Sequence, residues 1–217
     1  MKTDLEIQKH VMEELAWEPV LSPTEIGVGV KNGIVTLSGS VKTYAEKIAA
    51  ERAAQRVKGV KAVAIDLEVR LTRDGKIPDS KIAENVVQAL EWHTSIPEDR
   101  IRVKVDNGFV YLEGEVDWIY QKTAAATAIS TLSGIRGVEN KITVRPLVNS
   151  ENVKEKILQA LERNADLEAD NITVETSGTR VVLKGLARSW NERKEVERAA
   201  ASAPGVTEVD DQLTIIN

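Results

Sequence analysis

Apolar residues spaced four positions apart occur in three separate stretches of the chain. The three sets are Ile7, Val11 and Leu15; Ile82, Val86 and Leu90; and Val153, Ile157 and Leu161. Side chains with this spacing lie on one face of an α-helix. Asp4, Asp79 and Ser150, which are residues suited to capping, stand just before these sets. The pattern therefore predicts three amphipathic helices with these residues as N-caps.

Each predicted helix is followed by two stretches in which apolar and polar residues alternate. They run from Ile26 to Val41, from Ile101 to Val116 and from Ile172 to Ala187. Alternation of this kind is typical of strands with one buried face. The strands of each pair are separated by a turn dipeptide: type I′ at residues 32–33 and 107–108, and type II′ at 178–179. Three β-hairpins are predicted.

Two sets of glycines recur around these hairpins. The second strands contain Gly39, Gly114 and Gly185, where a missing side chain is expected to let a helix backbone come close. An alanine-rich helical pattern follows each hairpin, and Gly59, Gly134 and Gly205 are expected to end these helices as left-handed C-caps. A closing strand follows each of these glycines.

The glycine positions reveal an internal repeat. Gly39, Gly114 and Gly185 are separated by 75 and 71 residues, and so are Gly59, Gly134 and Gly205. A spacing kept over five successive segments indicates duplication. We expect units at residues 4–71, 79–146 and 150–217. The predicted fold class is α+β, with three tandem α-β-β-α-β units, each a three-stranded mixed sheet with both helices on one face. Units this small are marginal alone, so docking between them is expected.

The repeated unit resembles the BON domain, named for bacterial osmotically inducible and nodulation proteins. The resemblance rests on the hairpins together with the closing segments Gly59 to Val69, Gly134 to Val144 and Gly205 to Ile215, and covers nearly the whole chain. The third unit departs most, with Asp211 where the first has Ile65. The resemblance implies a non-enzymatic binding module of osmotic-shock and envelope-stress proteins that attaches to phospholipid or membrane surfaces.

Charge and composition narrow the classes of partner. The formal net charge is −5, and no expected unit is basic, which argues against nucleic acid as a partner. Cysteine is absent, which excludes thiol nucleophiles and cysteine-ligated metals. The N-terminus has no uninterrupted apolar stretch and no lipobox, so the chain as written is expected in the cytoplasm. A trimmed periplasmic protein would look the same.

The candidates for catalysis and metal binding have simpler interpretations. His10 and His93 occupy different repeat positions, and the adjacent acids Glu13-Glu14 and Asp210-Asp211 are interpreted as solvated surface. The glycines of residues 27–33 lie within a strand, not before a helix, which disfavours a phosphate loop. No catalytic, cofactor-binding or metal site is predicted, and no cofactor is expected.

Aromatic residues discriminate better between the functional alternatives. Trp17 and Trp92 share one repeat position at the end of the first helix, and we expect them to dock the units together. A second shared position, at the entry to the second helix, holds Tyr44, Ile119 and Trp190 and resembles a hydrophobic staple.

Only the second unit has aromatic residues on both sides of that second position, Trp118 and Tyr120. These two side chains are the predicted membrane or partner contact. The sequence therefore predicts a non-enzymatic adaptor that binds a phospholipid surface. A protein-interaction or chaperone-like scaffold is the alternative, and the oligomeric state is left open.

Overall fold

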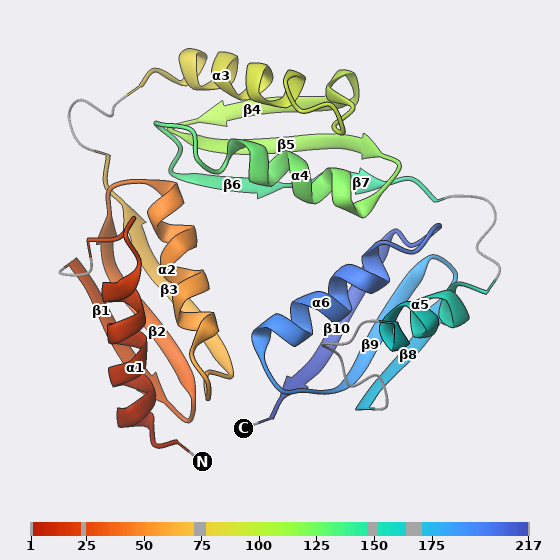
Figure 1. The fold of residues 1–217 in the computed structure, drawn as a ribbon. Coiled ribbons are helices and arrows are strands. Elements are labelled where there is room, and N and C mark those ends of the chain that lie inside the picture. Colours follow the sequence, from red (N-terminus) through yellow and green to blue (C-terminus); the bar gives the residue numbers. More distant parts are fainter. Residues whose placement is uncertain (1, 23–24, 72–76, 147–151, 164–170, 217) are drawn as a thin grey trace.

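The fold is described by a computed structural model over residues 2–22, 25–71, 77–146, 152–163 and 171–216 (Figure 1). The first unit comprises α1 (Asp4–Trp17), β1 (Ile26–Lys31), β2 (Ile34–Val41), α2 (Tyr44–Arg56) and β3 (Ala62–Val69). The second comprises α3 (Asp79–Glu91), the short 3-10 helix η3 (Glu98–Arg100), β4 (Ile101–Asp106), β5 (Phe109–Val116), α4 (Ile119–Ile129), β6 (Gly137–Asn140) and β7 (Thr143–Val144). The third comprises α5 (Val153–Glu162), β8 (Ile172–Ser177), β9 (Arg180–Ala187), α6 (Trp190–Ala201) and β10 (Glu208–Ile215).

The hairpin strand β2 is the centre of the first sheet. It pairs antiparallel with β1, with Ile26 opposite Gly39, and parallel with β3, with Val35 opposite Val63. The third sheet has the same order, and in the second sheet β6 and β7 together take the place of the closing strand. The predicted fold class, three tandem units with mixed three-stranded sheets, is confirmed.

Each unit has its own hydrophobic core. The residues spaced four apart in α1, α3 and α5 are all buried, and they pack with the inward residues of the hairpin and with the second helix. Small side chains on α2, including Ala50, Ala53 and Ala54, are fully buried. This burial lets the helix backbone lie close to the sheet, as the alanine-rich pattern indicates.

The predicted reason for the hairpin glycines is wrong in one respect. A β-carbon at Gly39, Gly114 or Gly185 would lie 2.1 Å from the carbonyl oxygen of Glu25, Arg100 or Asn171, respectively. These oxygens belong to the residue just before the partner strand of the same hairpin, not to a helix. The glycines therefore serve a close approach of two strands, with φ between 117° and 148°.

The predicted helix caps also need correction. Helix α1 has Thr3 as its N-cap, and α3 has Pro78, while Ser150 lies outside the described residues. Helices α2, α4 and α6 end before the predicted glycines, with C-caps at Val57, Ser130 and Ser202. Gly59, Gly134 and Gly205 do have positive φ, between 88° and 102°, but they shape the turn that leads into the closing strand.

Asp4 and Asp79 do not cap their helices but bind the turns of the hairpins. The carboxylate of Asp4 accepts the backbone N–H groups of Asn32 and Gly33, at 2.7 and 2.9 Å. Asp79 does the same for the second hairpin turn, at 2.7 and 3.0 Å. Both turns have the two positive φ angles of type I′. The first helix of these units is thus fixed to the hairpin tip.

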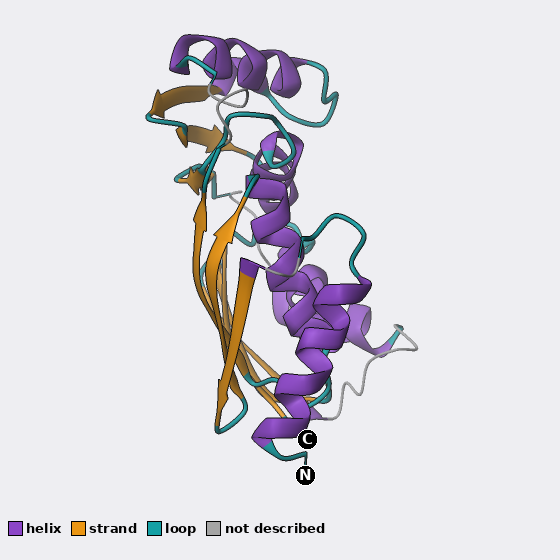
Figure 2. Ribbon diagram, turned by 90° about the vertical axis from the view of Figure 1, so that its left-hand side faces the viewer, coloured by secondary structure: helices purple, strands orange, loops and turns teal. Residues whose placement is uncertain are grey.

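The three units form a ring. Figure 1 shows α2, α4 and α6 toward the centre and α1, α3 and α5 farther out, and the two ends of the chain lie close together in both ribbon views. In the lower part of Figure 2, strands lie along one side of the molecule and helices along the other. Repeat-equivalent residues of different units therefore lie at similar places around the ring.

Candidate binding surface

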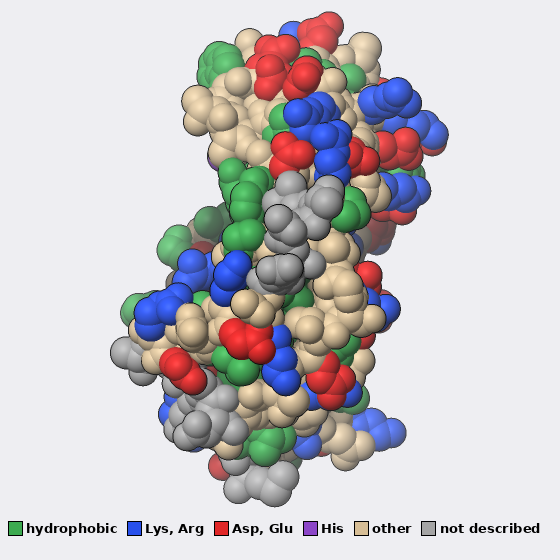
Figure 3. Space-filling model, turned by 90° about the vertical axis from the view of Figure 1, so that its right-hand side faces the viewer, with side chains coloured by type: hydrophobic (Ala, Val, Ile, Leu, Met, Phe, Trp, Pro, Cys, Tyr) green, Lys and Arg blue, Asp and Glu red, His purple; other side chains and the backbone are tan. Residues whose placement is uncertain are grey.

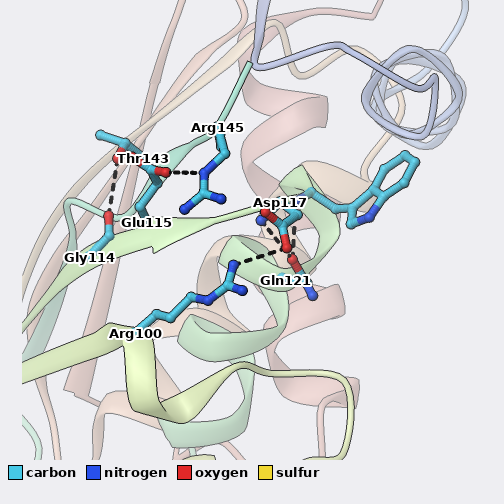
Figure 4. A network of polar contacts seen from close by, with 8 residues as sticks. Arg100, Gly114, Glu115, Asp117, Gln121, Thr143 and Arg145 are labelled. Carbon is cyan, nitrogen blue, oxygen red and sulfur yellow. Dashed lines mark hydrogen bonds and ion pairs between the residues drawn. The ribbon is translucent and has the colours of Figure 1, made fainter. Parts of the chain in front are cut away.

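The turn between β5 and α4 holds the predicted contact residues. The backbone N–H groups of Asp117 and Trp118 both donate to Gln121 Oε1 at 3.1 Å. Arg100 Nη1 donates to the Asp117 carboxylate at 3.0 Å (Figure 4). These bonds join the turn to the first residues of α4 and to η3. The turn is therefore a fixed platform for its aromatic side chains.

The two aromatic residues on this turn differ in exposure. Tyr120 is 51% exposed, whereas Trp118 is half-buried, and their ring centroids are 6.5 Å apart. Ile119, between them in sequence, packs against the core of the third unit. The pair therefore lies beside the junction of the second and third units. Its contact with a membrane or a partner stays a prediction.

The most exposed aromatic residues are Trp17 and Trp92. Their side chains are 84% and 79% exposed, so the prediction that they dock the units together is wrong. They stand at equivalent places, at or just after the last residue of α1 and α3, and Arg163 takes this place in the third unit. Each of the three side chains faces solvent.

Helix α1 adds further exposed apolar surface near Trp17. Leu5 is 77% exposed and Met12 is 56% exposed, and the two line a shallow hollow with Ala16 on the outer side of the helix. Trp17 itself lines a second hollow with Lys2, His10 and Lys58, and with two glutamates. The first helix of the first unit therefore presents exposed apolar side chains among charges of both signs.

The residues interpreted as a hydrophobic staple lie at the entry to the second helix, as predicted, but they have another role. Tyr44, Ile119 and Trp190 are the first residues of α2, α4 and α6, one position beyond the N-cap. Tyr44 packs against the core of the second unit, Ile119 packs against that of the third, and Trp190 bonds to the first. The staple interpretation is therefore wrong, and these residues make the contacts between units.

Several charged side chains on the surface form pairs with opposite charges. Arg145, just after β7, pairs with Glu115 on β5 at 2.5 Å (Figure 4), and Arg180 pairs with Asp210 at 2.8 Å across β9 and β10. On the side shown in Figure 3, acidic and basic side chains are interspersed. Such a surface is a weak attractor for a highly charged partner.

The histidines lie in simple surroundings. His10 Nδ1 is 3.0 Å from Lys2 Nζ, and His93 Nδ1 is 3.0 Å from Ser95 Oγ. Among the residues that the structure describes, no three His, Cys, Asp or Glu side chains come together to hold a metal ion. In the same ranges, no helix is long and apolar enough to cross a membrane.

The family comparison agrees with this architecture. The sequence profile of the BON domain matches three times, over residues 3–70, 78–146 and 149–217. The chain belongs to the BON domain family. The aspartate carboxylate that accepts both N–H groups of the hairpin turn, here called the carboxylate clamp, therefore occurs at equivalent places in the first two of three BON units, at Asp4 and Asp79.

A curated BON relative is osmotically-inducible protein Y of Escherichia coli (strain K12). It is 27% identical over 146 residues, which cover 65% of this chain and 73% of the relative. Among solved structures, the C-terminal domain of CdsD, a structural protein of the type III secretion system of Chlamydia trachomatis, is 14% identical over the full length of both chains. Its TM-score is 0.28, which is too low to indicate a shared overall fold.

Proposed function

We propose that this BON protein is a non-enzymatic, stress-related adaptor that attaches to a phospholipid surface through Trp17 and Trp92. The observation that carries the proposal is the exposure of these side chains, 84% and 79%, at equivalent places of two units. Indole rings favour the boundary between headgroups and acyl chains because one end is apolar and the other donates a hydrogen bond. The name of the Escherichia coli relative supports the stress-related role.

The exposed residues of α1 extend this surface. Leu5 and Met12 offer apolar area on the first helix, and Lys2 and Lys58 lie beside Trp17. The net charge of −5 opposes strong attraction to anionic lipid. Apolar insertion therefore supplies most of the affinity, and binding is expected to weaken little as salt is raised.

The test is vesicle co-sedimentation of the full chain with Trp17→Ala and Trp92→Ala substitutions. If half of an indole, about 100 Å², enters the membrane boundary, its loss costs about 2.5 kcal/mol, which corresponds to a decrease in affinity of about 60-fold for each tryptophan. Both residues lie outside the unit cores, so the melting temperature should stay unchanged. Undiminished vesicle binding by the double variant would contradict the proposal.

The Trp118 and Tyr120 pair is tested in the same assay. A Trp118→Ala and Tyr120→Ala variant should lose less affinity than the Trp17 and Trp92 variant, because Trp118 is already half-buried. A larger loss would place the contact at this turn, as the sequence predicts. Capture of an unfolded polypeptide with no vesicle binding would instead favour the chaperone-like scaffold.

A further inference from the structure

The side chain of the first residue of each second helix contacts a different unit of the chain. Tyr44 packs against the core of the second unit, and Ile119 packs against the core of the third. Trp190 Nε1 donates to the carbonyl oxygen of Val60 in the first unit at 3.0 Å. The contacts therefore run from first to second, from second to third and from third back to first.

The receiving surfaces are related as well. The Tyr44 phenol group lies beside the backbone of Val138, at the start of the closing strand of the second unit. Val60 precedes the closing strand of the first unit, and its repeat equivalent in the second unit is Ile135. At these two junctions, the first residue of a second helix thus meets the start of a closing strand or the turn just before it. A head-to-tail contact that repeats in this way generates a closed ring when its rotation closes.

The junction from the third unit to the first has no covalent connection of its own. The first two junctions are bridged by residues 72–76 and 147–151 of the chain, whereas the third depends on side chains. Lys194 Nζ donates to Gln55 Oε1 at 2.8 Å, which joins α6 to α2 beside Trp190. Noncovalent contacts must therefore hold this junction closed.

Trp190 is braced from within its own unit. The Arg193 guanidinium lies 5.1 Å from the centre of the indole ring, within cation–π range. Asp211 accepts from Arg193 Nε at 2.6 Å, and the pair is largely shielded from solvent. Because these contacts restrict the indole within its own unit, the Trp190 side chain loses less conformational entropy when it binds the first unit.

The bracing residues are peculiar to the third unit. The positions of Arg193 and Asp211 are occupied in the first two units by Lys47 and Ile65, and by Lys122 and Asn140. The departure of Asp211 from the repeat thus coincides with the junction that lacks a covalent connection.

We propose that Trp190, Arg193 and Asp211 form a clasp that holds the third unit on the first and closes the chain into a ring. The partner of this surface is the chain's own first unit, at Val60 and Gln55. Trp190 binds there, while Arg193 and Asp211 are positioning residues. Without the clasp, the two tethered junctions remain, and the chain opens into an arc.

The test uses the absence of native cysteine. A Gln55→Cys and Lys194→Cys chain is treated with a short bismaleimide, and the intramolecular product is followed with and without Trp190→Ala. Small-angle X-ray scattering of the same substitution in the native background gives the radius of gyration. Trp92→Ala is the matched control, since it removes an equally large side chain that is exposed and remote from the clasp.

We expect efficient intramolecular cross-linking in the parent and in the Trp92→Ala control. Trp190→Ala should lower the cross-linking rate by about tenfold or more, as for loss of a tryptophan hot spot, and raise the radius of gyration. Trp190→Phe should lie between the two, because it keeps the ring but loses the N–H donor. Trp190 lies outside the buried core of its own unit, so far-UV circular dichroism should be unchanged.

Two results would overturn the proposal. The first is a native chain whose small-angle scattering does not fit the closed ring, because the ring would then not close in solution. The second is a Trp190→Ala chain with the cross-linking rate and radius of gyration of the parent, because the junction would then not depend on the indole. Neither readout involves lipid, so failure of the clasp is distinguishable from failure of the proposed function.

Discussion

Substitution of Gly39 by alanine should destabilise the first BON unit selectively. The added β-carbon would lie 2.1 Å from the carbonyl oxygen of Glu25, whereas a carbon and an oxygen need about 3.3 Å. The strands would have to separate by about 1.2 Å, at the end of the hairpin where Gly39 pairs with Ile26. The φ of 117° adds a penalty of about 1–3 kcal/mol for any residue with a side chain.

The sum of these effects is large for so small a unit. Backbone strain together with the disrupted strand pairing should cost about 3–5 kcal/mol. A unit of this size has a free energy of unfolding of about 3–10 kcal/mol at typical values per residue. The substitution should therefore remove much of the stability of the first unit and leave the cores of the other two intact.

Gly29→Ala in the same hairpin is the matched control. A β-carbon at Gly29 would meet no atom within 4 Å, and its φ is not in the left-handed region. This substitution should be neutral or stabilise the unit by about 0.5 kcal/mol, because alanine restricts the unfolded chain. Hydrogen exchange followed by mass spectrometry assigns the change to one unit, and urea unfolding gives its size. Equal stability of the Gly39→Ala and Gly29→Ala variants would refute the reasoning from strand approach.

Two further substitutions test other parts of the fold. Asp79→Ala removes both hydrogen bonds to the turn at Asn107 and Gly108, and should lower the free energy of unfolding of the second unit by about 1–3 kcal/mol. Asp79→Asn keeps one acceptor oxygen and should lower it less. Urea unfolding measures both values. Glu197 is exposed at the surface, but partial desolvation by its neighbours raises the pKa of its carboxyl group, and the nearby Asp211 raises it further, so the effect on stability is small. The ionised form of Glu197 therefore costs stability above its unfolded pKa of about 4.3. Glu197→Gln should raise the melting temperature at pH 7, with no difference at a pH below that value, and an equal increase at both pH values would contradict the assignment.

The interior of each unit follows closely from its sequence. The spacing of Ile7, Val11 and Leu15 depends only on helix geometry, and the turn at Asn32-Gly33 depends on two neighbouring residues. Because these rules act over short distances, helices, hairpins and core residues were predictable, and so was membership of the family. The clamp made by Asp4 was missed, since an aspartate at a helix start suits an N-cap equally well.

The residues at the junctions between units could not be predicted from the sequence. Trp17 and Tyr44 are both aromatic residues at repeated positions, and their sequence contexts do not distinguish a solvent-exposed residue from one at a junction. The structure exposes Trp17 and places Tyr44 against the second unit, the reverse of the prediction. What decides between them is how the finished units pack against one another.

The sequence by itself determined the three repeated units, their elements and their cores, because local periodicity and turn chemistry fix those features. Only the tertiary structure decided that Trp190 meets Val60, which is 130 residues away along the chain. That contact depends on the shapes of surfaces built from several elements at once. No short sequence pattern encodes such a surface, so the sequence alone could not predict the contacts that close the ring.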